Sequence, residues 1–112
     1  MATVLIADSD ERTRRVAGAL VEALGHRVVY ELGRGHVDLV VVEPVCKEAL
    51  ALATSACNAR RSVPIICVSS GRRTIAGPTL RPLARLEKPL PVGPFVRALT
   101  RALKPPPPRF AA

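Results

Sequence analysis

The sequence has few aromatic residues, no long hydrophobic run and almost no acidic residues in its second half. Aromatic residues make up 3% of the chain and tryptophan is absent, so the core of a domain formed here is aliphatic. No apolar run approaches the roughly 20 residues that a transmembrane helix requires. Residues 1–3 lead directly into a strand-like run, without the basic and apolar regions of a signal peptide. We therefore expect a cytoplasmic protein without a membrane-spanning segment.

Two kinds of site are excluded by missing motifs. Cys46, Cys57 and Cys67 are odd in number and lack CxxC spacing, which predicts reduced thiols in a cytoplasmic core. Their spacing to His26 or His36 gives no metal site. No glycine-rich phosphate loop follows the first predicted strand, which excludes a P-loop or dinucleotide-binding enzyme.

Charge is distributed unevenly over a chain long enough for one small domain. The net charge is +8 over 112 residues. Residues 1–60 contain seven Lys and Arg against eight Asp and Glu, whereas residues 61–112 contain ten against one, Glu87. This asymmetry indicates an acidic partner, protein or nucleic acid, for the second half. The alternative is a solvated basic surface without a partner.

Short apolar runs alternate with helical patterns along the chain. Strands are predicted at residues 3–8, 26–31, 38–45, 63–70 and 84–86, and helices at 11–24, at 46–61 and from Pro94 onward. Residues 32–36 form a glycine-bearing connection in place of a helix, and prolines make the segment before the fifth strand irregular. We expect a domain at 1–104, followed by a proline-rich tail or linker at 105–112.

The nearly all-apolar strands predict a parallel sheet covered on both faces. Right-handed crossovers favour a flavodoxin-like three-layer sandwich with five strands in the order 2-1-3-4-5. Each helix has one apolar stripe facing the sheet. The stripes are Val16, Leu20 and Leu24 in the first helix, Cys46, Ala49, Leu50, Ala53 and Cys57 in the second, and Val96, Leu99 and Leu103 in the third.

Polar residues lie at or directly after the carboxyl ends of four predicted strands, where ligands bind in such sheets. They are Asp8, Ser9, Glu43, Ser69 and Lys88. Carboxylates bind hard cations, and a hydroxyl with a lysine binds phosphoryl oxygens, so this set contains the parts of a phosphate-and-magnesium site. The alternatives are that Asp8 only caps the following helix and that Ser69 is only a strand-end hydroxyl.

Four stretches carry a family resemblance: "VLIADSDERTRR", "VDLVVVEPV", "VPIICVSS" and "LEKPLPVGPFVRAL". Along nearly its whole length the chain resembles the receiver domain of bacterial two-component response regulators. The resemblance implies that Glu43 occupies the position of the aspartate that accepts a phosphoryl group from a histidine kinase. Asp8 matches the first of two metal-binding acids, and Ser9 replaces the second. Ser69 matches the family's Ser/Thr, and Lys88 its lysine, which implies a cis Lys88–Pro89 bond.

The chain departs from the family pattern at several positions. Arg85 stands in place of the switch aromatic, and Asp8 and Glu43 are closer in sequence than in the family. Glutamate carries its carboxylate one methylene further than aspartate, which should severely slow phosphotransfer. Ser9 removes a charged oxygen that Mg²⁺ needs. We therefore expect a pseudo-receiver without enzymatic activity or cofactor, with Lys88 as counter-ion and, at most, weak Mg²⁺ binding at Asp8 and Glu43.

The predicted function is a phosphorylation-independent protein interaction module in signal transduction. Its partner is an acidic protein or an output domain, bound through a basic face that runs from the fourth strand to the last helix. The arginines of this face are Arg72, Arg73, Arg81, Arg85, Arg97 and Arg101. The alternatives are a working receiver that uses Glu43 and a regulator that binds nucleic acid, although stacking aromatics and a recognition motif are absent. A homodimer also remains open.

Overall fold

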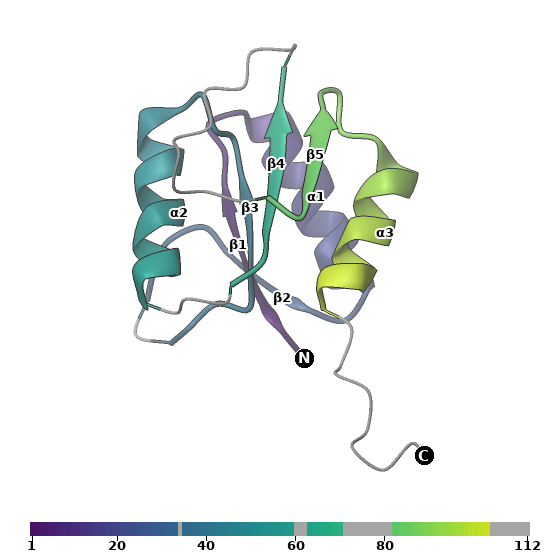
Figure 1. Ribbon diagram of the computed structural model, residues 1–112. Coiled ribbons are helices and arrows are strands. Elements are labelled where there is room, and N and C mark those ends of the chain that lie inside the picture. Colours follow the sequence, from purple (N-terminus) through teal and green to yellow (C-terminus); the bar gives the residue numbers. More distant parts are fainter. Residues whose placement is uncertain (34, 60–62, 71–81, 104–112) are drawn as a thin grey trace.

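Five parallel strands form one sheet with helices on both faces in the computed structural model, which describes residues 1–33, 35–59, 63–70 and 82–103. The strands run in the order β2-β1-β3-β4-β5, and Figure 1 shows α2 on one side of the sheet and α1 with α3 on the other. The predicted flavodoxin-like sandwich is confirmed. The elements are β1 (Thr3–Ala7), α1 (Glu11–Ala23), β2 (Arg27–Val29), β3 (Leu39–Val42), α2 (Lys47–Ala59), β4 (Ile65–Ser69), β5 (Ala84–Glu87) and α3 (Val92–Ala102).

Strand β3 shows why its sequence is apolar at every position. Leu39 and Val41 point to the core between the sheet and the α1 and α3 helices, whereas Val40 and Val42 point to the core under α2. All four side chains are fully buried. Alternation between two covered faces therefore replaces the alternation of apolar and polar residues that a one-sided sheet shows.

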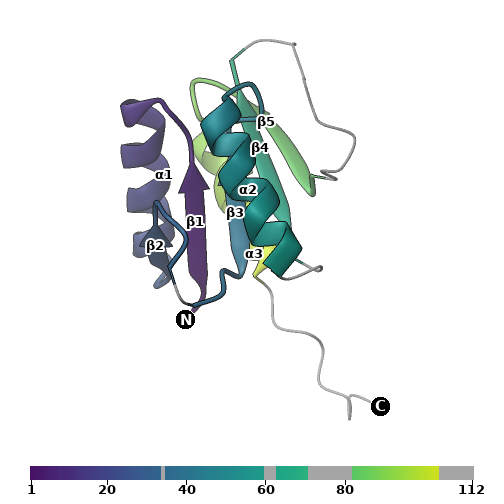
Figure 2. The same ribbon diagram turned by 90° about the vertical axis from the view of Figure 1, so that its left-hand side faces the viewer.

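The connection between β2 and β3 contains no helix within residues 30–33 and 35–38, the part of it that the structure describes. This confirms the predicted loss of a helix at that point, and Figure 2 shows the connection as a loop. Helix α2 covers β1 and β3, because its residues Ala49 and Ala53 share one core cluster with Leu5 of β1 and Val40 of β3. The segment predicted to be irregular lies mostly in residues 71–81, and that part is outside the described residues, as is the tail at 105–112.

The inward face predicted for α1 is wrong by about one residue. Val16 and Leu24 are each 42% exposed, whereas Ala17 and Val21 are fully buried. Gly18 is also buried, with the Tyr30 hydroxyl only 2.7 Å from where its Cβ would lie. Small residues let the helix approach the sheet closely. The face that they form is therefore buried, and the neighbouring row of larger side chains stays partly exposed.

The last helix differs from its prediction in its start and its buried face. Helix α3 begins at Val92 and not at Pro94, so Pro94 lies in its first turn. The missing N–H of Pro94 breaks no hydrogen bond there, because the amide groups of a first turn have no acceptor within the helix. Its buried residues are Phe95, Ala98 and Leu99, with Leu103 partly buried. Phe95 is the largest fully buried side chain in the described part of the protein, so the aliphatic core contains one aromatic residue that the predicted stripe omitted.

The three cysteines Cys46, Cys57 and Cys67 are free thiols. Burial raises the pKa of Cys57 and of Cys67, which favours the protonated thiol at neutral pH.

None of the helices in the described ranges is long and apolar enough to cross a membrane.

Candidate functional site

The ends of β1, β3 and β5 bring Asp8, Glu43 and Lys88 together. Strands β1 and β3 are neighbours with Ala7 beside Val42, so the residues that follow them lie side by side. Lys88 follows the edge strand β5, and its backbone N–H donates to the Ser69 carbonyl at 2.8 Å. Its long side chain therefore spans β4 to reach the centre of the sheet edge.

Lys88 forms the centre of an ion-pair cluster. Its Nζ lies 2.8 Å from Glu43 Oε2, 3.0 Å from Asp8 Oδ1 and 3.7 Å from Asp10 Oδ2. The side chains of Lys88, Glu43 and Asp8 are 11%, 9% and 0% exposed. Burial alone lowers the pKa of Lys88, but the hydrogen bonds and charges of Glu43 and Asp8 outweigh it and hold that pKa above its ordinary value of 10.5. Lys88 is therefore a charged and largely buried ammonium.

Both carboxylate oxygens of Glu43 have donors. Lys88 donates to Oε2, while Oε1 accepts the Ser9 hydroxyl at 2.7 Å and the Ser9 backbone N–H at 3.2 Å. Burial alone raises the pKa of Glu43, but these hydrogen bonds outweigh it, so that pKa lies below its ordinary value of 4.5. Glu43 is an ionised carboxylate fixed from both sides.

Asp8 is more deeply buried and less well paired. Its Oδ1 accepts the Asp10 backbone N–H at 2.8 Å as well as the Lys88 ammonium. Its Oδ2 is buried and has no hydrogen-bond partner among the described residues. Burial raises the pKa of Asp8 above its ordinary value of 3.8, although both of these donors act against the shift. The alternative that Asp8 only caps the helix does not describe this geometry, because the helix cap is Asp10.

Asp10 belongs to this cluster and was not among the predicted site residues. Its Oδ1 accepts the Arg12 backbone N–H at 3.0 Å, and its Oδ2 accepts the Thr13 hydroxyl at 3.1 Å. The same Oδ2 is the third carboxylate oxygen near Lys88. A signal was present in the sequence, because a residue two positions after Asp8 at a helix start must lie near the same sheet edge.

Ser69, the last residue of β4, and Ser70, which follows it, lie at the same edge. Ser69 is buried at the end of the strand, as its position predicted. Ser70, Glu43 and Lys88 line a hollow of about 590 Å³, together with Asp10, Arg12, Thr13, Val16, Pro89 and Leu90. The Lys88–Pro89 peptide bond is cis, as the sequence resemblance implied.

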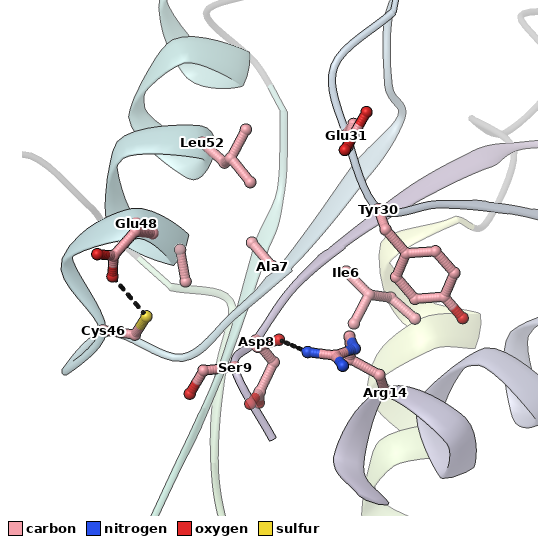
Figure 3. A pocket seen from close by; sticks show the side chains of 11 residues that line it. Ile6, Ala7, Asp8, Ser9, Arg14, Tyr30, Glu31, Cys46, Glu48 and Leu52 are labelled. Atoms are coloured by element: carbon pink, nitrogen blue, oxygen red, sulfur yellow. Dashed lines mark hydrogen bonds between the residues drawn. The ribbon is translucent and has the colours of Figure 1, made fainter. Parts of the chain in front are cut away.

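A second hollow, of about 460 Å³, lies beside the end of β1, where Ala7, Asp8 and Ser9 line it (Figure 3). It separates the β2–β3 connection, with Tyr30 and Glu31, from the start of α2, with Cys46 and Glu48. The Nη1 of Arg14 donates to the Asp8 carbonyl at 2.8 Å, and the Arg14 side chain lines this hollow. No helix covers this space within residues 30–33 and 35–38, the described part of the connection between β2 and β3.

A divalent cation does not fit the residues in their present arrangement. Mg²⁺ requires a near-octahedral set of oxygen ligands. Three of the four carboxylate oxygens of Asp8 and Glu43 already accept hydrogen bonds, and the Lys88 ammonium lies within 3.0 Å of both groups. No group of three or more His, Cys, Asp or Glu residues suited to a metal occurs in the part of the chain that the structure describes. The positive charge of this site comes from Lys88.

The basic face is described only in part. Arg85 on β5, and Arg97 and Arg101 on α3, are exposed, and β5 packs against α3. Arg72, Arg73 and Arg81 lie outside the described residues. Three of the six predicted arginines are therefore placed on adjoining surface elements.

Comparison with known proteins gives a fold. No protein-family model matches the chain, and no curated protein matches it in sequence. Among solved structures, the non-phosphorylated HemR receiver domain of Leptospira biflexa superposes with a TM-score of 0.74 at 17% identity, covering 98% of this chain and 100% of that one. The BeF3-activated DrrB receiver domain gives a TM-score of 0.76 at 14% identity, covering 94% of this chain and 99% of that one.

A third structure is the receiver domain of the sensor histidine kinase PA1611 from Pseudomonas aeruginosa PAO1, with a magnesium ion coordinated in its active site cleft. It has 20% identity and a TM-score of 0.68, covering 89% of this chain and 95% of that one. The chain therefore has the fold of a response-regulator receiver domain, with Asp8, Glu43 and Lys88 gathered at the carboxyl edge of its sheet.

Proposed function

We propose that the protein is a pseudo-receiver, a domain with the receiver fold that binds a signalling partner without accepting a phosphoryl group. The observation that supports this proposal is the state of Glu43, the residue at the position of the phospho-acceptor. Lys88 and Ser9 engage its two carboxylate oxygens. A nucleophile must approach its phosphoryl donor within a fraction of an ångström of the reacting geometry. A carboxylate held from both sides cannot do so without losing these hydrogen bonds.

Intact-mass measurement tests the loss of phosphotransfer. The protein is incubated with acetyl phosphate and Mg²⁺, in parallel with the variant Glu43→Gln, which keeps the side-chain length but cannot form an acyl phosphate. We expect neither the wild type nor the variant to gain mass on treatment. A stoichiometric increase of about 80 Da that appears only in the wild type would overturn the proposal.

The basic face is the proposed interaction surface. Arg85, Arg97 and Arg101 are exposed on two adjoining elements, and the net charge of the chain is +8. An array of exposed guanidinium groups attracts a carboxylate-rich protein surface and pairs with it bidentately. The partner that these guanidinium groups would bind is an acidic protein surface or an output domain.

A binding experiment tests this surface. Immobilised wild type is compared, in capture from the native lysate, with Arg85→Glu/Arg97→Glu. The matched control Arg27→Glu/Lys47→Glu makes the same change in net charge on β2 and α2, where both residues are exposed. We expect a partner to be captured by the wild type and the control but not by the first variant. Equal loss in both variants would show that only total charge matters.

Nucleic acid is the competing ligand for the same arginines. Binding to random DNA that falls steeply with salt, by roughly one power of the salt concentration for each phosphate contact, would replace the protein-partner proposal. We expect no binding to random DNA at low salt.

A further inference from the structure

Ser9 and Glu43 form a direct contact between the ends of two neighbouring strands. The Ser9 hydroxyl donates to Glu43 Oε1 at 2.7 Å, and the Ser9 backbone N–H donates to the same oxygen at 3.2 Å. The residues are separated by 34 positions in the sequence. Glu43 is 7% exposed, so this contact largely replaces the hydration of Oε1.

The length of Glu43 and the neutrality of Ser9 depend on each other. An aspartate at position 43 would withdraw its carboxylate by one methylene and leave the Ser9 hydroxyl without this acceptor. A carboxylate at position 9 would place an anionic oxygen near Oε1 of Glu43, and Asp8 and Asp10 already surround the same site. Repulsion between these groups would be strong because the site is largely shielded from water.

A carboxylate at position 9 would also change what the site can bind. At present Lys88 stands between Asp8 and Glu43, so two buried negative charges are offset by one buried positive charge. Asp8 Oδ2 is buried and lacks a hydrogen-bond partner within the described residues. Together with this oxygen and Glu43 Oε1, a carboxylate at position 9 would give three acidic ligands at the same edge of the sheet, and carboxylate oxygens are the ligands that small divalent cations prefer.

We propose that Ser9 is the residue that closes this site to divalent cations, by donating its hydroxyl proton to the Glu43 oxygen that a cation would otherwise use. This inference rests on the proposed function and deepens it. The residue at position 9 would then decide whether the carboxylates of Asp8 and Glu43 bind a divalent cation or pair with Lys88 alone. This inference concerns cation binding and can fail separately from the phosphotransfer proposal.

Thermal unfolding in EDTA and in millimolar Mg²⁺ or Mn²⁺ tests the proposal. We expect the melting temperature of the wild type to be the same in both. Ser9→Asp should melt lower than the wild type in EDTA, and the cation should raise its melting temperature by about 5 °C, as a cation present in roughly tenfold excess over its Kd does for a domain of this size. The matched control is Ser9→Asn, which has the same shape without the charge and should not respond.

A second variant covers the case in which Ser9→Asp does not fold. Ser9→Asp/Glu43→Asp withdraws the opposing carboxylate by one methylene and relieves the crowding, and it should also be stabilised by the cation. The proposal is overturned if the wild type responds to the cation as strongly as the Ser9→Asp variants do. It is also overturned if neither aspartate variant responds. The mass measurement on the wild type with acetyl phosphate is a separate readout, so failure of that experiment does not decide this one.

Discussion

The Lys88 ammonium lies 2.8 Å from the carboxylate of Glu43, although the two residues are 45 positions apart and follow strands that are separated by β4. The contact connects the edge strand of the sheet to its centre. Removing one partner from a buried pair leaves the other charge without compensation. The first two predictions follow from this relationship.

Replacing Lys88 with methionine should lower the free energy of unfolding by about 3–5 kcal/mol, because Asp8 and Glu43 would remain buried without a cation. Urea denaturation measures the change. The matched control is Arg85→Met on the same strand, which is exposed and should change stability by no more than about 0.5 kcal/mol. Adding Glu43→Gln to Lys88→Met should recover part of the loss. Equal losses of stability for Lys88→Met and Arg85→Met would mean that the ion pair contributes nothing to the free energy of unfolding.

The contribution of Lys88 should disappear in alkaline solution. The folded protein holds the pKa of Lys88 above its ordinary value of 10.5, mainly through Glu43 and Asp8 acting against burial. A raised folded-state pKa gives stability that is fully present below pH 10.5 and is lost as the pH rises through the folded-state value. The stability difference between the wild type and Lys88→Met should therefore be constant from neutral pH to about pH 10 and shrink above it. Urea titrations at a series of pH values check this, and a difference that grows with pH contradicts it.

Asp10 combines a helix cap with a charge near Lys88. Asp10→Ala should cost about 1 kcal/mol of stability, because α1 loses the acceptor for the Arg12 backbone N–H. Asp10→Asn keeps that acceptor and should cost less. The difference between the two variants in denaturation experiments separates the cap from the charge at 3.7 Å. If asparagine is as damaging as alanine, the charge is the larger contribution.

The buried face of α3 indicates which of its apolar residues contributes most to the stability of the core. Phe95→Ala should lower the free energy of unfolding by about 3–5 kcal/mol, because Phe95 is fully buried in the cluster that contains Val41 and Ile66. Val96→Ala is the neighbouring control and should cost clearly less, since Val96 is only partly buried. A larger loss for the Val96 variant would support the stripe expected from the sequence over the face in the structure.

The sheet and the central site could be predicted because both follow from rules that depend on few residues. Each strand is a short apolar run, and parallel strands with right-handed crossovers restrict the order to few possibilities. Once that order is fixed, the residues after β1 and β3 must be neighbours, which placed Asp8 beside Glu43. The reach of Lys88 across β4 followed from its position after β5.

The details that escaped sequence reasoning depend on side-chain packing and hydrogen-bond direction. Periodicity could not show that Ala17 and Gly18 bring α1 closer to the sheet than its larger residues would allow, or that Phe95 points inward. Ser9 was interpreted as the loss of a charged oxygen. Its role as a hydrogen-bond donor to Glu43 depends on the length of the glutamate side chain and the orientation of the hydroxyl, neither of which a residue spacing contains.

The ion pair between Asp8 and Lys88 joins residues that are 80 positions apart, and this separation has a consequence for the order of events in folding. Contacts between distant parts of a chain form late, because the entropy of closing a long loop must be overcome first. The cluster can form only when the last strand has joined the sheet. We therefore expect loss of Lys88 to accelerate unfolding while leaving the rate of folding nearly unchanged, which stopped-flow kinetics can measure. The residues that decide the chemistry of this site would then also set how long the folded domain lasts.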